Sequence, residues 1–206
     1  MKKLFSQFAI FIFLIGFISG QKVHASPMSD ALTGKLVSLQ GKTVKKYDDA
    51  ALLNAKYLAI YFSASWCPPC RGFTPDLVKW YQETKPKNPQ FALVFVSRDR
   101  SEDAMEDYIK TDSMPWPSLA YRKIENTAEI TKLAGRGIPC LVLIDQNGQV
   151  LSHSYEGETY IGPSKVLQDI DRVLAENPTS NTNASTATPS STTVGAGKFD
   201  IFADKK

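Results

Sequence analysis

Residues 61–75 of this chain read YFSASWCPPCRGFTP, with two cysteines separated by two prolines where an apolar run gives way to a helical pattern. If Pro68 and Pro69 fill the first helical turn, where a missing backbone N–H costs least, both sulfurs lie at the helix N-terminus. The unsatisfied N–H groups and the helix dipole favour an anion there, so the thiol pKa falls. The segment therefore predicts a redox-active pair, with Cys67 as the exposed nucleophile and Cys70 as the more buried thiol that resolves mixed disulfides.

Two other uses of the cysteine pair compete with this prediction. A zinc site would need two further ligands, and beyond the first 25 residues the chain offers only Cys140 and His153 in addition to the pair. A purely structural disulfide is disfavoured because a bridge across so short a loop removes little entropy from the unfolded chain. The position between a strand and a helix favours redox chemistry over both alternatives.

Three short apolar runs on either side of the motif indicate the centre of a sheet. Residues 58–63, 91–97 and 140–144 are nearly continuous in apolar character, as expected for strands covered on both faces. The sequence DQNG at 145–148 predicts a tight turn, so the third strand should form an antiparallel hairpin with residues 149–154.

Apolar residues recur at helical spacing in three other segments. One follows Cys70, another follows Ser101, whose hydroxyl is a candidate N-cap, and the longest spans residues 163–175. Residues 35–47 predict a small N-terminal hairpin, and residues 48–55 predict a short helix. The alternation of strands and helices predicts a three-layer α/β domain with a mixed sheet.

The N-terminal segment has the features of a secretory signal peptide. Lys2 and Lys3 precede an apolar run over residues 4–18, and small residues at positions 23 and 25 suit cleavage before Ser26. We expect an exported protein, periplasmic or secreted, with no stable membrane insertion after cleavage. A retained N-terminal anchor is the alternative, although the apolar run is short for a membrane span.

The chain divides into four parts by composition. Residues 177–197 contain no charged or aromatic side chain and cannot bury enough apolar surface to offset the entropy of ordering. We expect the following parts: a signal peptide at 1–25, a linker at 26–33, the folded domain at 34–176 and a disordered tail rich in Ser, Thr and Asn at 177–206.

The formal net charge of +3 comes entirely from the signal segment. The 206 residues include 24 Lys and Arg and 21 Asp and Glu, and residues 1–25 hold three lysines and no acidic residue. The remainder is neutral, which argues against the broad positive field of a nucleic-acid-binding protein. Three cysteines are also too few for a disulfide scaffold, so we expect them to act in chemistry.

The string WCPPCR after a strand resembles the thioredoxin superfamily, and residues 61–77 are similar to its tryparedoxin and nucleoredoxin branch. FVSRDR at 95–100, MPW at 114–116 and GIP at 137–139 support that branch and occur in its order. The resemblance covers about residues 34–176. It implies a thioredoxin fold, in which a central mixed β-sheet is flanked by helices, with an additional N-terminal β-hairpin. It also implies thiol–disulfide exchange without an organic cofactor or a metal, the Cys67–Cys70 disulfide itself being the redox group.

The resemblance also assigns roles to individual residues. Cys67 matches the attacking thiol and Cys70 the resolving thiol, whereas Trp66 matches an aromatic side chain of the substrate-contact surface, with core packing as the alternative. Pro139 matches the family's cis-proline, and Ile138 before it would hold substrate through backbone hydrogen bonds. Pro68 and Pro69 would restrict the loop in both redox states.

Two positions depart from the family pattern. Tyr61 stands where many thioredoxins place a buried acid, so the base is unassigned, with water, Glu83 or Asp99 as weak candidates. Cys140 directly follows the presumed cis-proline, and we expect a buried thiol there; a third redox thiol or a copper(I) ligand is the alternative. His153 is expected on the surface of a strand.

These observations predict an exported oxidoreductase that reduces disulfides in proteins or peptides. The oxidised pair would be recycled by a membrane-embedded or thioredoxin-like electron donor. The competing prediction is a copper or cytochrome-maturation chaperone that uses Cys67 and Cys70, with Cys140 as an optional third thiol.

Overall fold

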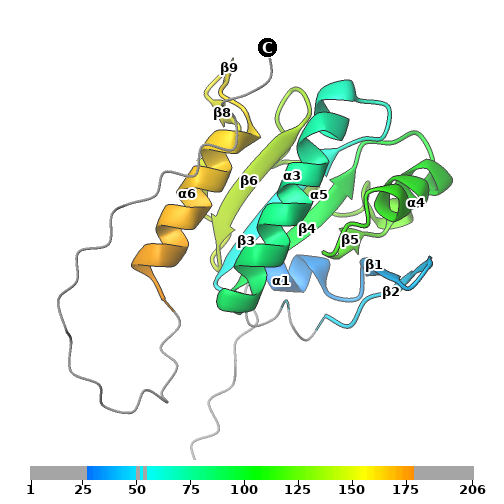
Figure 1. Cartoon of the computed structure of the whole chain (residues 1–206), viewed down its shortest axis with the longest axis horizontal. Helices are drawn as coiled ribbons and strands as arrows, with labels where there is room; N and C mark the ends of the chain where they lie inside the picture. Colours follow the sequence, from blue (N-terminus) through cyan, green and yellow to red (C-terminus); the bar gives the residue numbers. More distant parts are fainter. Residues whose placement is uncertain (1–26, 50–51, 53–54, 179–206) are drawn as a thin grey trace, which may run out of the picture.

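The computed structural model describes residues 27–49, 52 and 55–178. They form three layers around a seven-stranded mixed sheet, with helices α3 and α6 lying across the face viewed in Figure 1. Helix α4 packs with α3 and α6 on that face, and α1 and α5 pack on the other. The helices are α1 (Pro27–Leu32), α3 (Pro68–Thr84), α4 (Glu102–Thr111), α5 (Ala128–Thr131) and α6 (Pro163–Glu176), with short 3-10 turns at Lys85–Lys87 and Tyr121–Lys123. The predicted α/β architecture is confirmed.

The three predicted central strands lie side by side. Strand β3 (Tyr57–Ser63) pairs in parallel with β4 (Phe91–Ser97) and antiparallel with β6 (Cys140–Asp145). Every residue of β4 is buried, which explains the continuous apolar run. Because β3 and β4 are parallel and Ser63 lies opposite Ser97, the loops that follow them leave the sheet at the same edge. The cysteine motif belongs to one of these two loops.

The outer strands complete the order β2-β1-β5-β4-β3-β6-β7. Both predicted hairpins are present: β1 pairs antiparallel with β2, and β6 pairs antiparallel with β7. In the turn between β6 and β7, a carboxylate oxygen of Asp145 accepts the backbone N–H groups of Asn147 and Gln149 at 2.8 Å. The outer strands are β1 (Leu36–Gln40), β2 (Thr43–Lys46), β5 (Ser118–Leu119) and β7 (Val150–His153).

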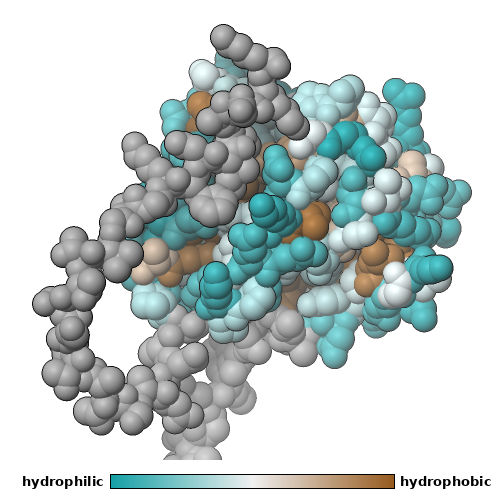
Figure 2. Space-filling model, viewed as in Figure 1, coloured by the Kyte–Doolittle hydropathy of each residue, from teal (hydrophilic) through white to brown (hydrophobic). Residues whose placement is uncertain are grey.

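Successive side chains of β3 pack alternately into the two hydrophobic clusters, one on each face of the sheet. Ala59 and Tyr61 face the cluster formed with α3, α4 and α6, whereas Ile60 and Phe62 face the cluster formed with α1 and α5. In Figure 2 the part of this face that grey atoms leave visible is largely hydrophilic, with small separate hydrophobic patches. The helices are therefore amphipathic, as their spacing predicts.

Helix boundaries agree with the predicted signals. The Ser101 hydroxyl accepts the N–H of Ala104 at 3.2 Å and caps α4, as predicted. The last helix, predicted over 163–175, runs from Pro163 to Glu176. No helix in the described part of the chain has the length and apolar character that a membrane span requires.

The segment expected to be a linker, residues 26–33, differs from its prediction. Helix α1 occupies most of it, and Met28 and Leu32 are buried in the cluster of the α1 and α5 side. These two side chains are four residues apart and share one face of the helix. A single apolar pair in a six-residue helix gives little periodicity, so the sequence pattern did not reveal it.

A second small sheet was not predicted. Strands β8 (Tyr155–Glu156) and β9 (Thr159–Tyr160) form a hairpin whose turn begins at Gly157, with φ +59°. The signal segment 1–25 and the tail from residue 179 lie outside the described residues, as do residues 50, 51, 53 and 54 of the helix predicted over 48–55.

Candidate active site

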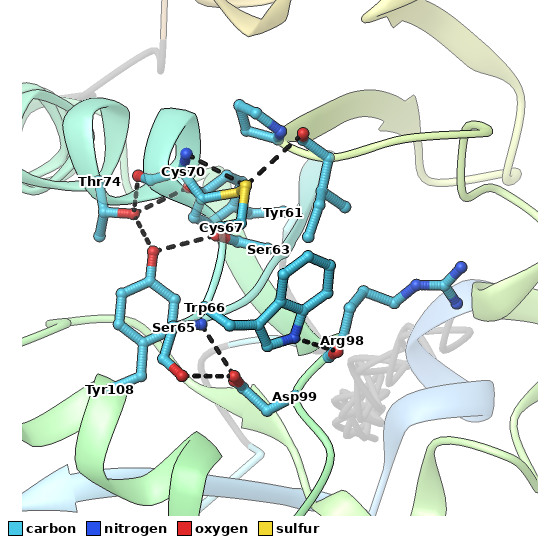
Figure 3. Close-up of a disulfide and its surroundings, with 12 residues drawn as sticks. Tyr61, Ser63, Ser65, Trp66, Cys67, Cys70, Thr74, Arg98, Asp99 and Tyr108 are labelled. Carbon is cyan, nitrogen blue, oxygen red and sulfur yellow. Dashed lines mark hydrogen bonds between the residues drawn. A yellow bond between two sulfur atoms is a disulfide. The ribbon is translucent and has the colours of Figure 1, made fainter.

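Cys67 is the N-cap residue of α3, and Pro68 and Pro69 occupy the first turn, as predicted. The Cys67 sulfur accepts the backbone N–H of Cys70 at 3.3 Å (Figure 3). The N-terminus of a helix leaves such N–H groups without intrahelical partners, and they stabilise negative charge. In the reduced protein the same geometry would stabilise a Cys67 thiolate.

The two cysteines are joined in a disulfide, with their Cα atoms 5.2 Å apart. Cys67 is 4% exposed and Cys70 is completely buried. Cys67 is thus the more accessible sulfur, but it is less open than the sequence prediction of an exposed nucleophile. The reason is local packing, because Ala64 and Ile138 form a small apolar cluster with both cysteines.

The loop before β6 lies against the disulfide. The Ile138–Pro139 peptide bond is cis, as the family resemblance implied. The carbonyl oxygen of Ile138 lies 3.7 Å from the Cys67 sulfur. The backbone N–H of Ile138 donates to no other described residue. This backbone can therefore pair with an extended polypeptide that approaches Cys67.

Trp66 lies on the surface beside Cys67. Its side chain is 55% exposed, and the indole N–H donates to the carbonyl oxygen of Arg98 at 3.1 Å. Figure 3 shows the ring beside the backbone of the loop after β4. The exposure excludes the alternative in which Trp66 packs in the core, and the hydrogen bond fixes the ring at the active-site edge.

Asp99 braces the loop that carries the cysteine motif. One carboxylate oxygen accepts the backbone N–H of Ser65 at 2.8 Å and the Ser65 hydroxyl at 2.7 Å. The other oxygen accepts the Ser97 hydroxyl at 2.7 Å. Both carboxylate oxygens thus accept hydrogen bonds from residues next to Trp66 and Arg98. This geometry favours a positioning role for Asp99 over the role of a base for Cys70.

A buried network of hydroxyl groups lies beneath Cys70. Thr74 donates to the Cys70 carbonyl oxygen at 2.9 Å. Its hydroxyl oxygen also lies 2.8 Å from the Tyr61 hydroxyl and 2.6 Å from that of Tyr108. The Tyr108 hydroxyl reaches Ser63 at 3.0 Å. Tyr61, at the position of the family's buried acid, is thus one member of a neutral polar layer.

Burial keeps the phenols of this network protonated. It raises the pKa of Tyr61 and of Tyr108 above the ordinary value, because a phenolate is poorly solvated there. Neither phenol is therefore suited to accept a proton from Cys70 at neutral pH. The other weak candidate, Glu83, lies in the last turns of α3, roughly 20 Å along the helix from Cys70.

Arg71 is held in place by two contacts. It forms an ion pair with Asp112 at 2.9 Å, and its guanidinium carbon lies 5.1 Å from the ring centroid of Tyr108. Burial raises the pKa of Asp112, and the positive charge of Arg71 opposes that shift. The cation next to Cys70 is therefore largely paired.

Cys140 occupies a different environment from the pair. It is completely buried opposite Phe62 in the cluster on the α1 and α5 side. Burial raises the pKa of its thiol. This packing agrees with the expected buried thiol and does not favour a three-thiol copper site. Within the described ranges, no group of three or more His, Cys, Asp or Glu side chains is arranged to hold a metal ion.

His153 is half-buried and more constrained than a strand-surface residue. Its Nδ1 accepts the backbone N–H of Tyr155 at 2.9 Å, so Nε2 carries the proton and donates to the carbonyl oxygen of Leu133 at 3.0 Å. The Cys140 sulfur lies 4.0 Å from Nε2. The imidazole thus has two backbone partners and serves as a local brace.

Sequence reasoning missed the bracing and network residues around the pair. The contribution of Ser97, which donates to Asp99, could have been predicted from the sequence, because the ends of the parallel strands β3 and β4 meet at one edge of the sheet. Thr74 and Tyr108 gave no comparable signal, since their contact depends on how α3 and α4 pack together.

Comparison with known proteins agrees with this geometry. A thioredoxin-like family model matches residues 54–150. Nucleoredoxin from Bos taurus is 33% identical over 146 residues, which are 70% of this chain and 31% of that protein. Tryparedoxin from Trypanosoma brucei brucei is 41% identical over 95 residues, which are 45% of this chain and 63% of that protein. The chain thus spans about a third of the length of the nucleoredoxins it matches.

Solved structures give the same result. Thioredoxin from Wuchereria bancrofti superposes with a TM-score of 0.50 and 36% identity, covering 70% of this chain and 97% of that one. Tryparedoxin from Trypanosoma brucei superposes with a TM-score of 0.52 and 27% identity, covering 73% of this chain and 97% of that one.

Proposed function

The chain belongs to the thioredoxin superfamily of oxidoreductases, in the branch of the nucleoredoxins and tryparedoxins, and on that premise we propose that it reduces protein disulfides outside the cytoplasm. One observation carries the proposal. The Cys67–Cys70 disulfide caps α3 while Cys67 faces the cis-proline loop. A nucleophile, a resolving thiol and a free backbone edge thus meet at one place.

In the first step, the reduced protein attacks a substrate disulfide with the Cys67 thiolate. A bond forms between Cys67 and one substrate sulfur, and the substrate S–S bond breaks. The second substrate sulfur leaves as a thiolate. The N–H of Cys70, which reaches the Cys67 sulfur, stabilises the attacking anion before it reacts.

In the second step, Cys70 attacks the Cys67 sulfur and releases the other substrate sulfur. The proton of Cys70 passes to a departing substrate thiolate, directly or through water, so no protein carboxylate is required. The sum converts one substrate disulfide and the protein dithiol into a substrate dithiol and the protein disulfide, with two electrons transferred. The neutral hydroxyls around Thr74 hold the backbone of Cys70 during this exchange.

An extended substrate would lie along the cis-proline loop. The N–H of Ile138, which has no partner among the described residues, and its carbonyl oxygen offer one donor and one acceptor beside Cys67. Strand addition of this kind recognises the polypeptide backbone in any sequence. Trp66, exposed next to Cys67, would contact the side chains that flank the substrate cysteine.

The proposed site of action rests on the pattern of the N-terminal segment. Residues 1–25 have the pattern of a secretory signal, so the mature domain would work in an oxidising compartment. Reduction there needs an electron donor, either embedded in the membrane or thioredoxin-like. Fractionation of a bacterial host that expresses the full chain tests this part: a cytoplasmic protein that retains residues 1–25 would contradict it.

Insulin reduction tests the activity. The protein, kept reduced by dithiothreitol, should precipitate insulin chains much faster than dithiothreitol alone, and Cys67→Ser should return the rate to that background. A wild-type rate equal to the background would contradict the proposed function.

A further inference from the structure

The β8–β9 hairpin, residues 155–160, lies beside the active-site loop, and the exchange steps described above do not use it. In Figure 1 it stands at one end of the molecule, next to α6 and β6. The hairpin contacts loop residues 135–139 at three separate places, and each contact involves a different residue of the hairpin.

The first contact joins Tyr160 to the cis-proline. The Tyr160 hydroxyl donates to the Pro139 carbonyl oxygen at 2.9 Å. The preceding carbonyl, that of Ile138, lies against the Cys67 sulfur. Tyr160 therefore holds the carbonyl group next to the one that faces the reactive sulfur.

The other two contacts hold the beginning of the loop. The Tyr155 ring lies so close to Gly135 that a Cβ there would collide with it, and the Tyr155 hydroxyl lies against Gly137. Glu158 in the hairpin turn forms an ion pair with Arg136. This pair is exposed and contributes little energy, so the aromatic contacts dominate.

Tyr160 remains accessible although it is held in place. Its side chain is 47% exposed, which makes it, with Trp66, one of the few exposed large apolar side chains among the described residues. The Tyr155 ring centroid lies 5.0 Å from that of Tyr160. A ring held by a second ring and by a hydrogen bond from its hydroxyl loses little freedom on binding a partner. Tyr and Trp are enriched among the residues that dominate binding at the centres of interfaces.

The sheet places the two exposed aromatic residues on opposite sides of Cys67. Cys67 follows β3, whose neighbours are β4 and β6. Trp66 is tied to Arg98, directly after β4, whereas Tyr160 is tied to Pro139, directly before β6. The backbone groups that anchor the two rings therefore lie on either side of the strand that leads to the reactive sulfur.

We propose that Tyr160 is a specificity-determining residue that, together with Trp66, selects extended polypeptides with apolar or aromatic side chains next to the reacting cysteine. The hydrogen bond from its hydroxyl to the Pro139 carbonyl oxygen holds the ring in place beside the loop. This inference rests on the proposed function. A small disulfide such as glutathione disulfide can reach Cys67 without spanning both rings, so it should gain little from Tyr160.

The test compares insulin with glutathione disulfide as substrates of the full-length protein. Tyr160→Ala should raise KM for insulin about tenfold with kcat nearly unchanged, which is the scale of one aromatic anchor. The same variant should reduce glutathione disulfide with kcat/KM within about twofold of wild type. Tyr160→Phe, which keeps the ring, should retain most of the affinity for insulin. Leu151→Ala, at an exposed apolar residue of β7, is the matched control and should change neither substrate.

Each outcome has one meaning. An unchanged KM for insulin in Tyr160→Ala would overturn the inference while leaving the proposed function intact. Equal losses on both substrates would also overturn it, because they would show a general defect of the site. A wild-type protein that reduces neither substrate would overturn the proposed function and this inference together. Thermal unfolding of each variant by circular dichroism identifies any loss of fold.

Discussion

Cys67 and Cys140 lie on either side of the same cis-proline loop, yet their surroundings differ. The Cys67 sulfur faces the Ile138 carbonyl and accepts an N–H at the start of α3. Cys140 begins β6 one residue after Pro139 and is enclosed by apolar side chains such as Phe62. One thiol is placed where negative charge is stabilised, and the other where burial raises the pKa.

This difference shows that position within an element decides what a thiol can do. A helix N-terminus offers N–H donors without partners to a sulfur that stays near the surface, whereas a sulfur buried among apolar side chains loses the solvation that its anion needs. The two sites also differ in their packing: uncharged hydroxyl groups lie under Cys70, whereas apolar side chains surround Cys140. Four predictions test the comparison, from the largest expected effect to the smallest.

Removing either member of the pair should have the largest effect. We expect Cys67→Ser and Cys70→Ser to lower turnover of insulin by roughly a thousandfold or more, the scale of losing a nucleophile. Only Cys70→Ser should accumulate mixed disulfides with substrate, detectable by non-reducing electrophoresis, because its Cys67 can attack but cannot be released. Equal trapping by both variants would contradict the assigned roles.

Loss of the hydroxyl network should destabilise the fold beneath the pair. Thr74→Val keeps the shape but removes the oxygen that contacts Cys70, Tyr61 and Tyr108, so it should cost about 1–3 kcal/mol in urea unfolding. The control is Thr43→Val in the exposed strand β2, with an expected change within about 0.5 kcal/mol. Equal costs at the two sites would show that the network is not a structural layer.

Cys140 should make the oxidised protein less stable as pH rises above about 8.5. The unfolded thiol ionises near that pH, whereas burial raises the pKa in the folded protein, so the folded state keeps a proton that the unfolded state releases. Stability should therefore fall by up to about 1.4 kcal/mol per pH unit between pH 8.5 and 9.5. Urea unfolding of Cys140→Ala should lack this slope; an identical slope in both proteins would contradict the assignment.

Replacement of Cys140 should have the smallest effect, a small change in the rate of thiol–disulfide exchange. Cys140→Ser should reduce insulin within about twofold of the wild-type rate, because the buried sulfur belongs to a different cluster from the pair. A collapse of activity in a variant with a normal unfolding curve would make Cys140 a functional thiol and remove the contrast between the two sites.

The Cys67–Cys70 motif and the central strands could be predicted from the sequence. Most of the residues that support the motif in the folded protein could not. Cys67, Cys70 and the two prolines form a local motif, and β3, β4 and β6 are marked by continuous apolar runs, so short-range patterns suffice. Helix α1 and the β8–β9 hairpin have only a few residues each, too short for a period to emerge. Thr74, Tyr108 and Tyr160 act through contacts between distant segments, which depend on tertiary packing.

The limited exposure of Cys67 illustrates the same point. Its place at the start of α3 follows from the proline pair, but its 4% exposure depends on Ile138, which is distant in sequence. Local chemistry predicted the reactive sulfur, and the fold determines which partners can reach it.

The contrast between the two thiols is tested most directly by alkylation of the reduced, folded protein with iodoacetamide across a pH series, read at each cysteine by mass spectrometry. We expect Cys67 to react first, with a midpoint below the ordinary thiol value of about 8.5, and Cys140 to stay protected until the protein unfolds. Rapid labelling of Cys140 in the folded protein, or a Cys67 midpoint at or above about 8.5, would contradict this description of the site.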